Sequence, residues 1–360
     1  MQLSIKFNIC LLKILFTFAT NIFTDLKKIL LIRFSSIGDI ILTTPIVRAL
    51  KEQLKCELHV LTKKQYEGIF KKNPRVDVVH SFEKSLEEIL SKLKNENFDF
   101  VVDLQKNIRS KRVIRAIKKP WASFPKLNIE KWLLVNFKIN KLPKKHIVDR
   151  YFDAVKSLDV TNDGLGLEYY LPKNETVNPI SIDEILKNGF ITWVIGGQHF
   201  TKIMPTEKVA SIISELKLPV VLLGGSEDSS RGEEIVKLSD NNSVFNACGQ
   251  FSLNGSASLV EQAKLVITND TGLMHIAAAF KKPVISLWGN TIPEFGMYPY
   301  LPSEENTSVI SEVKNLSCRP CSKLGHKKCP KKHFKCMLEQ NEALILKSAE
   351  ELISNPNPFQ

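Results

Sequence analysis

Short apolar runs alternate with amphipathic segments along most of the chain. Apolar runs of this kind are typical of strands buried in a parallel sheet, and apolar residues at every third or fourth position predict helices. In the N-terminal half the pattern predicts strands at residues 28–34, 57–62, 76–80 and 98–104, and helices starting at residue 40 and over residues 86–93. This alternation predicts an α/β domain, a doubly wound parallel sheet with helices on both faces.

A second series of the same kind follows a polar segment with little periodicity, residues 172–188, which contains Pro172 and Pro179. We interpret this segment as an interdomain linker with a short helix. Beyond it the pattern predicts strands at residues 190–195, 219–223, 265–268 and 283–287, and a helix over residues 205–216. A chain of 360 residues is long enough for two domains, each with its own core.

The predicted organisation therefore has five parts. They are an apolar N-terminal extension (1–26), a first Rossmann-like domain (27–172), the linker (173–188), a second Rossmann-like domain (189–345) and a C-terminal helix or tail (346–360).

Composition adds one feature to this picture, an excess of positive charge. The hydrophobic fraction of 43% and the charged fraction of 24% are typical of a soluble globular protein, but the formal net charge is +12. Such a charge indicates an acidic partner, for example a phosphorylated sugar or lipid or an anionic membrane, although scattered lysines on a solvated surface explain it equally well. The chain has no helix-turn-helix, zinc-finger or RNA-binding signature, so we expect no nucleic-acid partner.

The first residues form an apolar stretch, residues 9–19, that is interrupted by Lys13. It is too short and too broken for a membrane span, and it lacks the small residues of a signal-peptide cleavage site. Three interpretations are left, in this order: a mis-assigned translation start, an interfacial amphipathic anchor, or a poor signal sequence. Folded structure is expected to begin near Lys27.

The turn after the first predicted strand carries an acid where nucleotide-binding loops usually have glycines or a lysine; residues 35–39 read SSIGD. Ligands of doubly wound domains bind at this end of the strands. Asp39 would repel a phosphate but is placed to take a proton from a hydroxyl group. The alternative is that Asp39 only caps a helix, and we regard this as the weaker interpretation because Thr43, Thr44 and Pro45 supply a cap and first turn for the main helix.

The most specific motif spans residues 267–279, ITNDTGLMHIAAA. A predicted strand ends at Asn269 and Asp270, Thr271 and Gly272 form a turn, and a helix of small residues follows. The first amide groups and the dipole of such a helix suit a pyrophosphate. Asp270 can accept hydrogen bonds from sugar hydroxyls, or it can serve only as a helix cap.

Residues 268–289 together with residues 34–45 resemble the heptosyltransferase family, glycosyltransferase family 9, of lipopolysaccharide core assembly. The resemblance covers nearly the whole chain from about Lys27 to Glu351. It implies a GT-B fold, with two Rossmann-like doubly wound domains facing a central cleft, the acceptor in the N-terminal domain and the nucleotide sugar in the C-terminal one. Four further markers occur in the same order: residues 103–110 (DLQKNIRS), 149–151 (DRY), 202–205 (KIMP) and 224–225 (GG).

The resemblance implies an inverting transfer of heptose from ADP-heptose to a lipid A-linked core acceptor, with no metal or cofactor required for catalysis. Asp39 matches the family's proposed general base, a group that typically contributes ~10²–10⁴-fold. Lys202 matches the family lysine that contacts phosphate, where a cation offsets the charge of the leaving diphosphate.

The implied binding residues fall into two sets. The sequence does not decide whether Glu227 or Asp228 holds the ribose. For Arg112, a position on a solvated helix face is as well supported as a contact with the acceptor. The predicted donor-binding residues are Lys202, Gly224, Gly225, Glu227, Asp228, Asn269, Asp270, Thr271, Gly272, Leu273 and His275. The predicted acceptor-binding residues are Ser36, Gly38, Asn107, Arg109 and Arg112.

Four cysteines gather near the C-terminal end of the second domain, at Cys318, Cys321, Cys329 and Cys336. Four thiols in so short a stretch suit a structural zinc ion, although the spacing is not that of a standard zinc finger. The alternative is a set of buried free cysteines. Disulfides are not expected, because an ADP-sugar donor indicates the cytoplasm.

Two other functions are left open by the sequence: a GT-B transferase with a different nucleotide sugar, and a non-catalytic protein that binds sugar nucleotides. The presence of both Asp39 and Lys202 argues against the second. An NAD-dependent oxidoreductase is disfavoured, because neither first-strand loop reads Gly-x-Gly-x-x-Gly. We expect a monomer that acts on the cytoplasmic face of the inner membrane as a peripheral protein, because a basic surface and an apolar N-terminus suit docking on anionic lipid.

Overall fold

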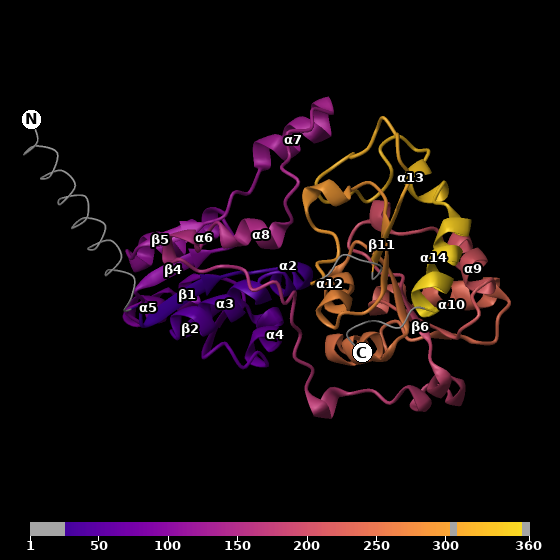
Figure 1. The fold of residues 1–360 in the computed structure, drawn as a ribbon, viewed down its shortest axis with the longest axis horizontal. Helices are drawn as coiled ribbons and strands as arrows, with labels where there is room; N and C mark the ends of the chain where they lie inside the picture. The colour runs from indigo at the N-terminus through magenta and orange to yellow at the C-terminus, as the bar shows by residue number, and fades with distance from the viewer. Residues whose placement is uncertain (1–25, 303–307, 355–360) are drawn as a thin grey trace, which may run out of the picture. The chain divides into compact units, whose positions relative to one another are not determined.

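The computed structural model describes residues 26–302 and 308–354 (Figure 1). The predicted N-terminal extension lies outside the described residues, except for its last position. Among the described helices, none has both the length and the apolar character required to cross a membrane.

The first sheet has five parallel strands in the order β3-β2-β1-β4-β5. The central strand β1 (Lys28–Ile32) and its neighbour β4 (Phe100–Asp103) are almost wholly buried, because helices cover both faces of a parallel sheet. The other strands are β2 (Glu57–Lys63), β3 (Val78–Phe82) and β5 (Trp121–Ser123). The helices of this part are α3 (Thr44–Leu54), α4 (Glu67–Lys71), α5 (Glu87–Asn95) and α6 (Ile108–Ile117).

The second sheet has six parallel strands in the order β11-β10-β9-β6-β7-β8. Its core forms around the fully buried Trp193 on the central strand β6. The strands are β6 (Ile191–Val194), β7 (Val220–Leu223), β8 (Val244–Asn246), β9 (Leu265–Asn269), β10 (Val284–Trp288) and β11 (Ser308–Glu312). The helices are α9 (Thr206–Ser214), α10 (Ser229–Ser239), α11 (Leu253–Gln262), α12 (Gly272–Ala279), α13 (Lys335–Leu338) and α14 (Glu342–Ser354).

Contacts among residues divide the chain into two compact units that are not continuous in sequence. The first unit comprises the residues up to Ser35 together with Ile46–Pro125 and Tyr151–Asn162. The second unit comprises Ser36–Pro45, Lys126–Arg150 and the chain from Asp163 onward. The second unit therefore includes α2 (Ile37–Ile41), α7 (Asn128–Phe137) and most of α8 (Ile147–Phe152).

The predicted linker contains three short 3₁₀ turns, at Lys173–Glu175, Pro179–Ser181 and Glu184–Asn188. The predicted domain boundaries at residues 172 and 188 stay predictions.

Two local predictions differ from the structure. The helix expected from residue 40 is two helices, α2 and α3, because the chain turns at Thr43 and Thr44, whose hydroxyls donate to the carbonyls of Ile40 and Ile41 at 2.7 and 2.8 Å. The polar loop expected over residues 105–110 is shorter, because Asn107 caps α6 and the helix begins at once. The two sheets themselves confirm the prediction of two Rossmann-like α/β domains.

Candidate functional site

Asp39 lies in the first turn of α2 and takes part in capping that helix. Its Oδ2 atom accepts hydrogen bonds from the backbone N–H of Ser36 at 3.2 Å and from the Ser36 hydroxyl at 3.0 Å. This is the acidic half of a capping box. Asp39 therefore does cap a helix, which is the weaker of the two interpretations of the sequence. Capping is compatible with a role as a base, because an ionised carboxylate has about four acceptor positions.

Helix α2 packs directly on α12 because each helix presents a glycine to the other. A Cβ atom at Gly38 would lie 2.5 Å from Cδ2 of His275, and a Cβ atom at Gly272 would lie 2.9 Å from Cγ2 of Ile37. Separations this short are almost never found for real side chains, so both positions require glycine for this approach. The packing brings the two most informative sequence motifs together within the second unit.

Lys202 and Asp270 form an ion pair beside the N-terminus of α12. The Nζ atom of Lys202 lies 2.6 Å from Oδ2 of Asp270, and the hydroxyl of Thr291 donates to the same oxygen at 3.1 Å. Helix α12 begins after its N-cap residue Thr271, so its first amide groups lie next to this ion pair. Such a group suits a sugar diphosphate. The cation and the helix N-terminus can contact phosphate, and the carboxylate can accept hydrogen bonds from the sugar.

His275 is buried in the first turns of α12, close to both acids. Burial lowers the pKa of its imidazole to about 4, although the charges of Asp270 and Asp39 act in the opposite direction. Its Nδ1 atom has no hydrogen-bond partner among the described residues. A neutral imidazole with one nitrogen unpaired is able to accept or donate a hydrogen bond to a ligand that enters here.

The two acids after β7 have different surroundings. Asp228 is buried, accepts a hydrogen bond from the Gly225 N–H at 3.0 Å and lies 3.5 Å from Nη2 of Arg231. Burial raises the pKa of the Asp228 carboxyl. Glu227 is exposed. Asp228 therefore shapes the Gly224–Gly225 turn, and a ribose contact by either acid stays a prediction.

Asn269 holds the end of β6 in place. Its side-chain Nδ2 lies between 3.1 and 3.3 Å from the carbonyl oxygens of Val194, Ile195 and Gly196, all of which accept from it. The structure therefore gives Asn269 a positioning role at the carboxyl ends of the central strands, and its contacts with a donor stay a prediction.

Three of the predicted acceptor-binding residues lie on α6 or at its start, in the first unit. Asn107 caps this helix by accepting a hydrogen bond from the Ser110 N–H at 2.9 Å, while the Ser110 hydroxyl donates to Asp103 at 2.8 Å. Arg109 is exposed, and Arg112 pairs with Glu87 on the helix surface, as its solvated alternative predicted. Ser36 and Gly38 belong to the second unit, so a shared acceptor site stays a prediction.

Lys131 on α7 is a candidate that the sequence did not reveal. Its Nζ atom lies 5.7 Å from the centre of the Phe295 ring. Burial and the charge of Arg150 lower its pKa to about 8, and Asp39 acts in the opposite direction. A cation held partly out of water near Asp39 is suited to an anionic ligand. No sequence signal marks it, because it is one of many scattered lysines.

Arg150 and Thr291 were also missed as site residues. Arg150 is buried and donates to the carbonyl of Phe295 at 2.8 Å, and its neighbour Asp149 accepts from the Tyr300 hydroxyl at 2.8 Å. The DRY marker at residues 149–151 was a signal for this region. Thr291 follows the end of β10, a position that sequence alone does not distinguish from an ordinary loop.

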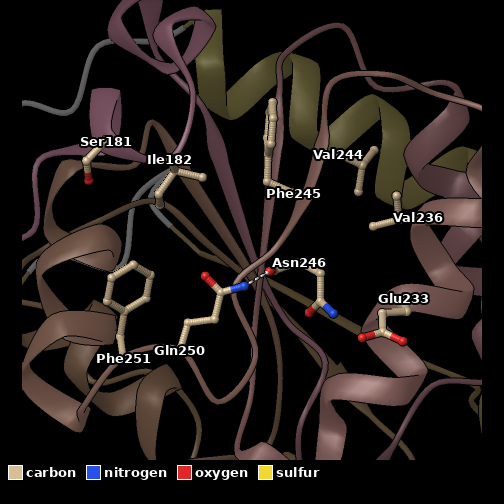
Figure 2. Close-up of a pocket in the computed structure, with 9 residues that line it drawn as sticks. All are labelled: Ser181, Ile182, Glu233, Val236, Val244, Phe245, Asn246, Gln250 and Phe251. Atoms are coloured by element: carbon tan, nitrogen blue, oxygen red, sulfur yellow. Dashed lines mark hydrogen bonds between the residues drawn. The ribbon is translucent and has the colours of Figure 1, made fainter.

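A separate hollow of about 640 Å³ lies near the edge strand β8 of the second unit (Figure 2). Gln250 lies beside Asn246 and donates to its carbonyl at 2.7 Å. The described residues that line it include no lysine or arginine and none of the predicted site residues. It is therefore poorly suited to a diphosphate.

The four C-terminal cysteines are free thiols that face one region. Sγ of Cys318 lies 3.7 Å from Nε2 of His333, and the Cys321 thiol donates to the carbonyl of Cys318 at 3.0 Å. Burial raises the pKa of Cys321 to about 12 and that of Cys336 to about 11, and neighbouring thiolates, Cys329 among them, act in the same direction.

Zinc bound by four thiolates holds them about 3.8 Å apart. Within the described chain, no three of these sulfur and imidazole ligand atoms lie within 4.8 Å of one another. A zinc ion would therefore require the loop to tighten, and the structural zinc stays a prediction.

Comparison with known proteins agrees with this geometry. The model of glycosyltransferase family 9 (heptosyltransferase) matches residues 87–333. The lipopolysaccharide heptosyltransferase 1 of Campylobacter coli is 26% identical over 295 residues, which cover 73% of this chain and 84% of that protein.

Two solved structures share the fold. A glycosyl transferase family 9 protein from Veillonella parvula superposes with a TM-score of 0.70 at 22% identity, covering 92% of this chain and 98% of that one. The E. coli ADP-heptose lipopolysaccharide heptosyltransferase II gives a TM-score of 0.67 at 19% identity, covering 91% and 98%. These likenesses confirm the predicted GT-B fold class. Because the family model matches well over half of its length, this chain belongs to glycosyltransferase family 9, the heptosyltransferases, and is a glycosyltransferase.

Proposed function

We propose that this protein transfers heptose from ADP-heptose to a lipid A-linked core acceptor of lipopolysaccharide, with inversion at the anomeric carbon and with Asp39 as the general base. The single observation that carries the proposal is the packing of α2 on α12, which brings the Asp39 turn into one unit with Lys202, Asp270 and His275. The C. coli relative named for lipopolysaccharide heptosyl transfer and the solved ADP-heptose enzyme support the choice of donor and acceptor.

The donor half of the mechanism uses Lys202 and the N-terminus of α12. In the proposal the Lys202 ammonium leaves Oδ2 of Asp270 for a diphosphate oxygen, and the first amides of α12 contact the same group. Asp270 is then available to accept hydrogen bonds from sugar hydroxyls. Positive charge held at the diphosphate stabilises the leaving group as the glycosidic bond breaks, and it requires no metal ion.

The acceptor half uses Asp39. Its carboxylate takes the proton of the acceptor hydroxyl as that oxygen attacks the anomeric carbon from the face opposite the diphosphate. The new carbon–oxygen bond forms, the bond to the diphosphate breaks, and ADP leaves. The two hydrogen bonds from Ser36 hold the carboxylate in one orientation, which is what a positioned base requires.

Peripheral binding to an anionic membrane is part of the proposal, and α7 supports it. Ile129, Trp132 and Phe137 are 71%, 51% and 58% exposed. The rings of Trp132 and Phe137 meet edge to face at 5.2 Å, and Leu134 on the same helix is buried against Ile292 and Phe295. Exposed aromatic side chains suit the headgroup region of a bilayer.

The lysines near α7 complement anionic headgroups. They are Lys126, Lys141, Lys144 and Lys145. Lysines near a membrane surface contribute about 1 kcal/mol each to binding. A cytoplasmic, monomeric protein that docks through this helix is the form in which we propose the enzyme to act.

The proposal is tested by donor choice. Purified protein and a truncated core acceptor are incubated with ADP-heptose and, in parallel, with UDP- and GDP-sugars, and release of nucleoside diphosphate is followed. Release with ADP-heptose alone is expected, and the anomeric configuration of the product, read by NMR, should be opposite to that of the donor. Turnover only with another donor would replace the substrate assignment, and no turnover with any donor would contradict the transferase proposal.

A further inference from the structure

A buried histidine pair lies in the first unit, outside the groups that the proposed transfer uses. His59 on β2 and His80 on β3 are each 1% exposed. Glu96, the third member of the group, is the residue directly after α5. His59, His80 and Glu96 each offer one ligand atom, a ring nitrogen or a carboxylate oxygen, and these three atoms all lie within 4.8 Å of one another. Among the described residues, no other three histidine, cysteine or acidic side chains meet this condition.

The two strands place both rings on one face of the sheet. His80 is paired in register with Leu61, which is two residues from His59, and side chains two apart on a strand point the same way. Nδ1 of His59 lies 2.8 Å from Nε2 of His80, and that nitrogen lies 4.0 Å from Oε1 of Glu96. We propose that these three side chains bind a zinc ion.

The distances suit such an ion. Zinc bonds of 2.0–2.1 Å in tetrahedral geometry separate neighbouring ligand atoms by about 3.3 Å. The two separations in the structure, 2.8 and 4.0 Å, lie on either side of this value, and each differs from it by less than about 1 Å. Small side-chain rotations therefore complete the site, with a fourth position for water. The ion replaces the hydrogen that now joins the two rings, and His80 then carries its proton on Nδ1.

The surroundings of His59 are those of a metal ligand. Its outer nitrogen, Nε2, lies 2.8 Å from Oε1 of Glu57, so the carboxylate accepts from it and the lone pair of Nδ1 is directed at the site. A carboxylate behind a ligating histidine is the usual support for zinc.

Two carboxylates supply negative charge around the site, and two lysines oppose it. Glu57 and Glu96 supply two negative charges, and Lys28 opposes a cation, with its Nζ 3.2 Å from Oε2 of Glu96 and 3.6 Å from Oε2 of Glu57. Lys92 is a second positive charge that acts on His80. The two carboxylates match the charge of a divalent ion, and the two lysines weaken its binding.

The position of the site indicates a structural role. Lys28 and Glu57 are the first residues of β1 and β2, so the histidine pair lies near the amino ends of these strands. Ligands of doubly wound domains bind at the opposite, carboxyl edge. An ion here ties β2, β3 and the segment after α5 together without entering the glycosyl transfer. The inference is therefore independent of the proposed function.

The test measures zinc binding to the chelator-treated full-length protein by isothermal titration. Cys318→Ser/Cys321→Ser is the background, because it removes thiols that would take up zinc elsewhere. In this background one equivalent of zinc should bind, and cobalt should give d–d absorption without sulfur charge-transfer bands. Adding His80→Gln or Glu96→Gln should weaken binding at least tenfold. Glu96→Gln serves as the second variant, because its partly exposed side chain is less critical for folding.

Two further variants separate ligation from folding. Glu57→Gln, which alters only the support of His59, should weaken binding by ~10–100-fold, and Lys28→Met should tighten it. Zinc should raise the Tm of the background protein but not that of the His80→Gln protein. A background protein that binds no zinc, or one whose affinity is unchanged by both His80→Gln and Glu96→Gln, overturns the proposal.

Discussion

Gly38 on α2 lies so close to the imidazole of His275 on α12 that a Cβ atom at position 38 would come within 2.5 Å of Cδ2 of the ring. This contact joins a turn near the start of the chain to a helix more than two hundred residues later. It also explains why a glycine precedes the candidate base: any side chain here would move α2, and Asp39 with it, away from α12.

Gly38→Ala should therefore reduce both stability and turnover. Overpacking of this kind typically costs about 1–3 kcal/mol, and here it displaces the helix that carries Asp39. Urea unfolding gives the first quantity and initial rates of ADP release give the second. Gly68→Ala in α4 is the matched control, because a Cβ atom there has no neighbour within 4 Å; it should leave turnover unchanged and stabilise the protein by about 0.5–1 kcal/mol. The same stability and the same turnover in Gly38→Ala and Gly68→Ala would contradict the close packing of α2 on α12.

Asp39→Asn should separate the base from the cap. An asparagine at this position still offers an oxygen to Ser36, so α2 should keep its cap, but it cannot take a proton at neutral pH. We expect kcat to fall by ~10²–10⁴-fold with little change in ADP affinity. Asp39→Ala should lose the same activity and, in addition, about 1 kcal/mol of stability. Near-normal turnover by the asparagine variant would reduce Asp39 to a cap.

Lys202→Met should weaken ADP binding and lower kcat. Loss of one hydrogen-bond donor aimed at developing charge typically costs ~10²–10³-fold, and the remaining Asp270 carboxylate would in addition repel the diphosphate. Lys208→Met is the matched control, because this lysine is equally sheltered, at 13% against 17% side-chain exposure, and pairs with Glu342 at 2.5 Å. If both variants lost the same activity, the role of Lys202 would be structural.

Replacing the exposed aromatic side chains of α7 should release the protein from anionic lipid. Trp132→Ser/Phe137→Ser removes two exposed rings and leaves the buried Leu134 in place. In co-sedimentation with vesicles containing phosphatidylglycerol, the variant should bind at least tenfold more weakly than the parent. Neither should bind neutral phosphatidylcholine vesicles, and kcat/KM with a soluble truncated acceptor should be unchanged. Unaltered sedimentation would exclude α7 as the docking surface.

Stability should decrease as the pH falls from about 6.5 toward 4. Burial lowers the pKa of His80 and His275 to about 4 in the folded protein, from the ordinary histidine value of 6.5. Between pH 6.5 and 4 the two histidines bind protons more readily in the unfolded chain than in the folded protein. The free energy of unfolding is therefore highest above pH 6.5 and decreases as the pH falls through this range. Urea unfolding of metal-free protein at several pH values gives the free energy of unfolding as a function of pH. This free energy should depend less steeply on pH for His80→Gln than for the parent. Identical slopes would mean that His80 is protonated in the folded state.

Much of the fold follows from local sequence. The strand β1 is predictable because a strand buried on both faces must be apolar at successive positions, and the same holds for β6 and β9. The edge strands β5 and β8 are three residues each and carry no such pattern, so they emerge only from pairing with their neighbours.

The candidate site divides in the same way. Asp39 and Asp270 are recognisable from the sequence because each stands near the end of a predicted strand, where ligands of such domains bind. Lys202 is recognisable only through the family resemblance. The different surroundings of Glu227 and Asp228 are not predictable from the sequence, because they depend on burial: Glu227 is exposed, and Asp228 accepts a hydrogen bond from the Gly225 N–H.

The sequence by itself determined the two α/β series, the strand ends and the residue types that chemistry at those ends requires, since these depend on periodicity and on neighbouring positions. Only the tertiary structure decided that Gly38 meets His275, that Lys202 pairs with Asp270, and that His59 and His80 share one face of a sheet. Such contacts depend on strand order and on the close approach of helices, which bring together residues that no local pattern connects.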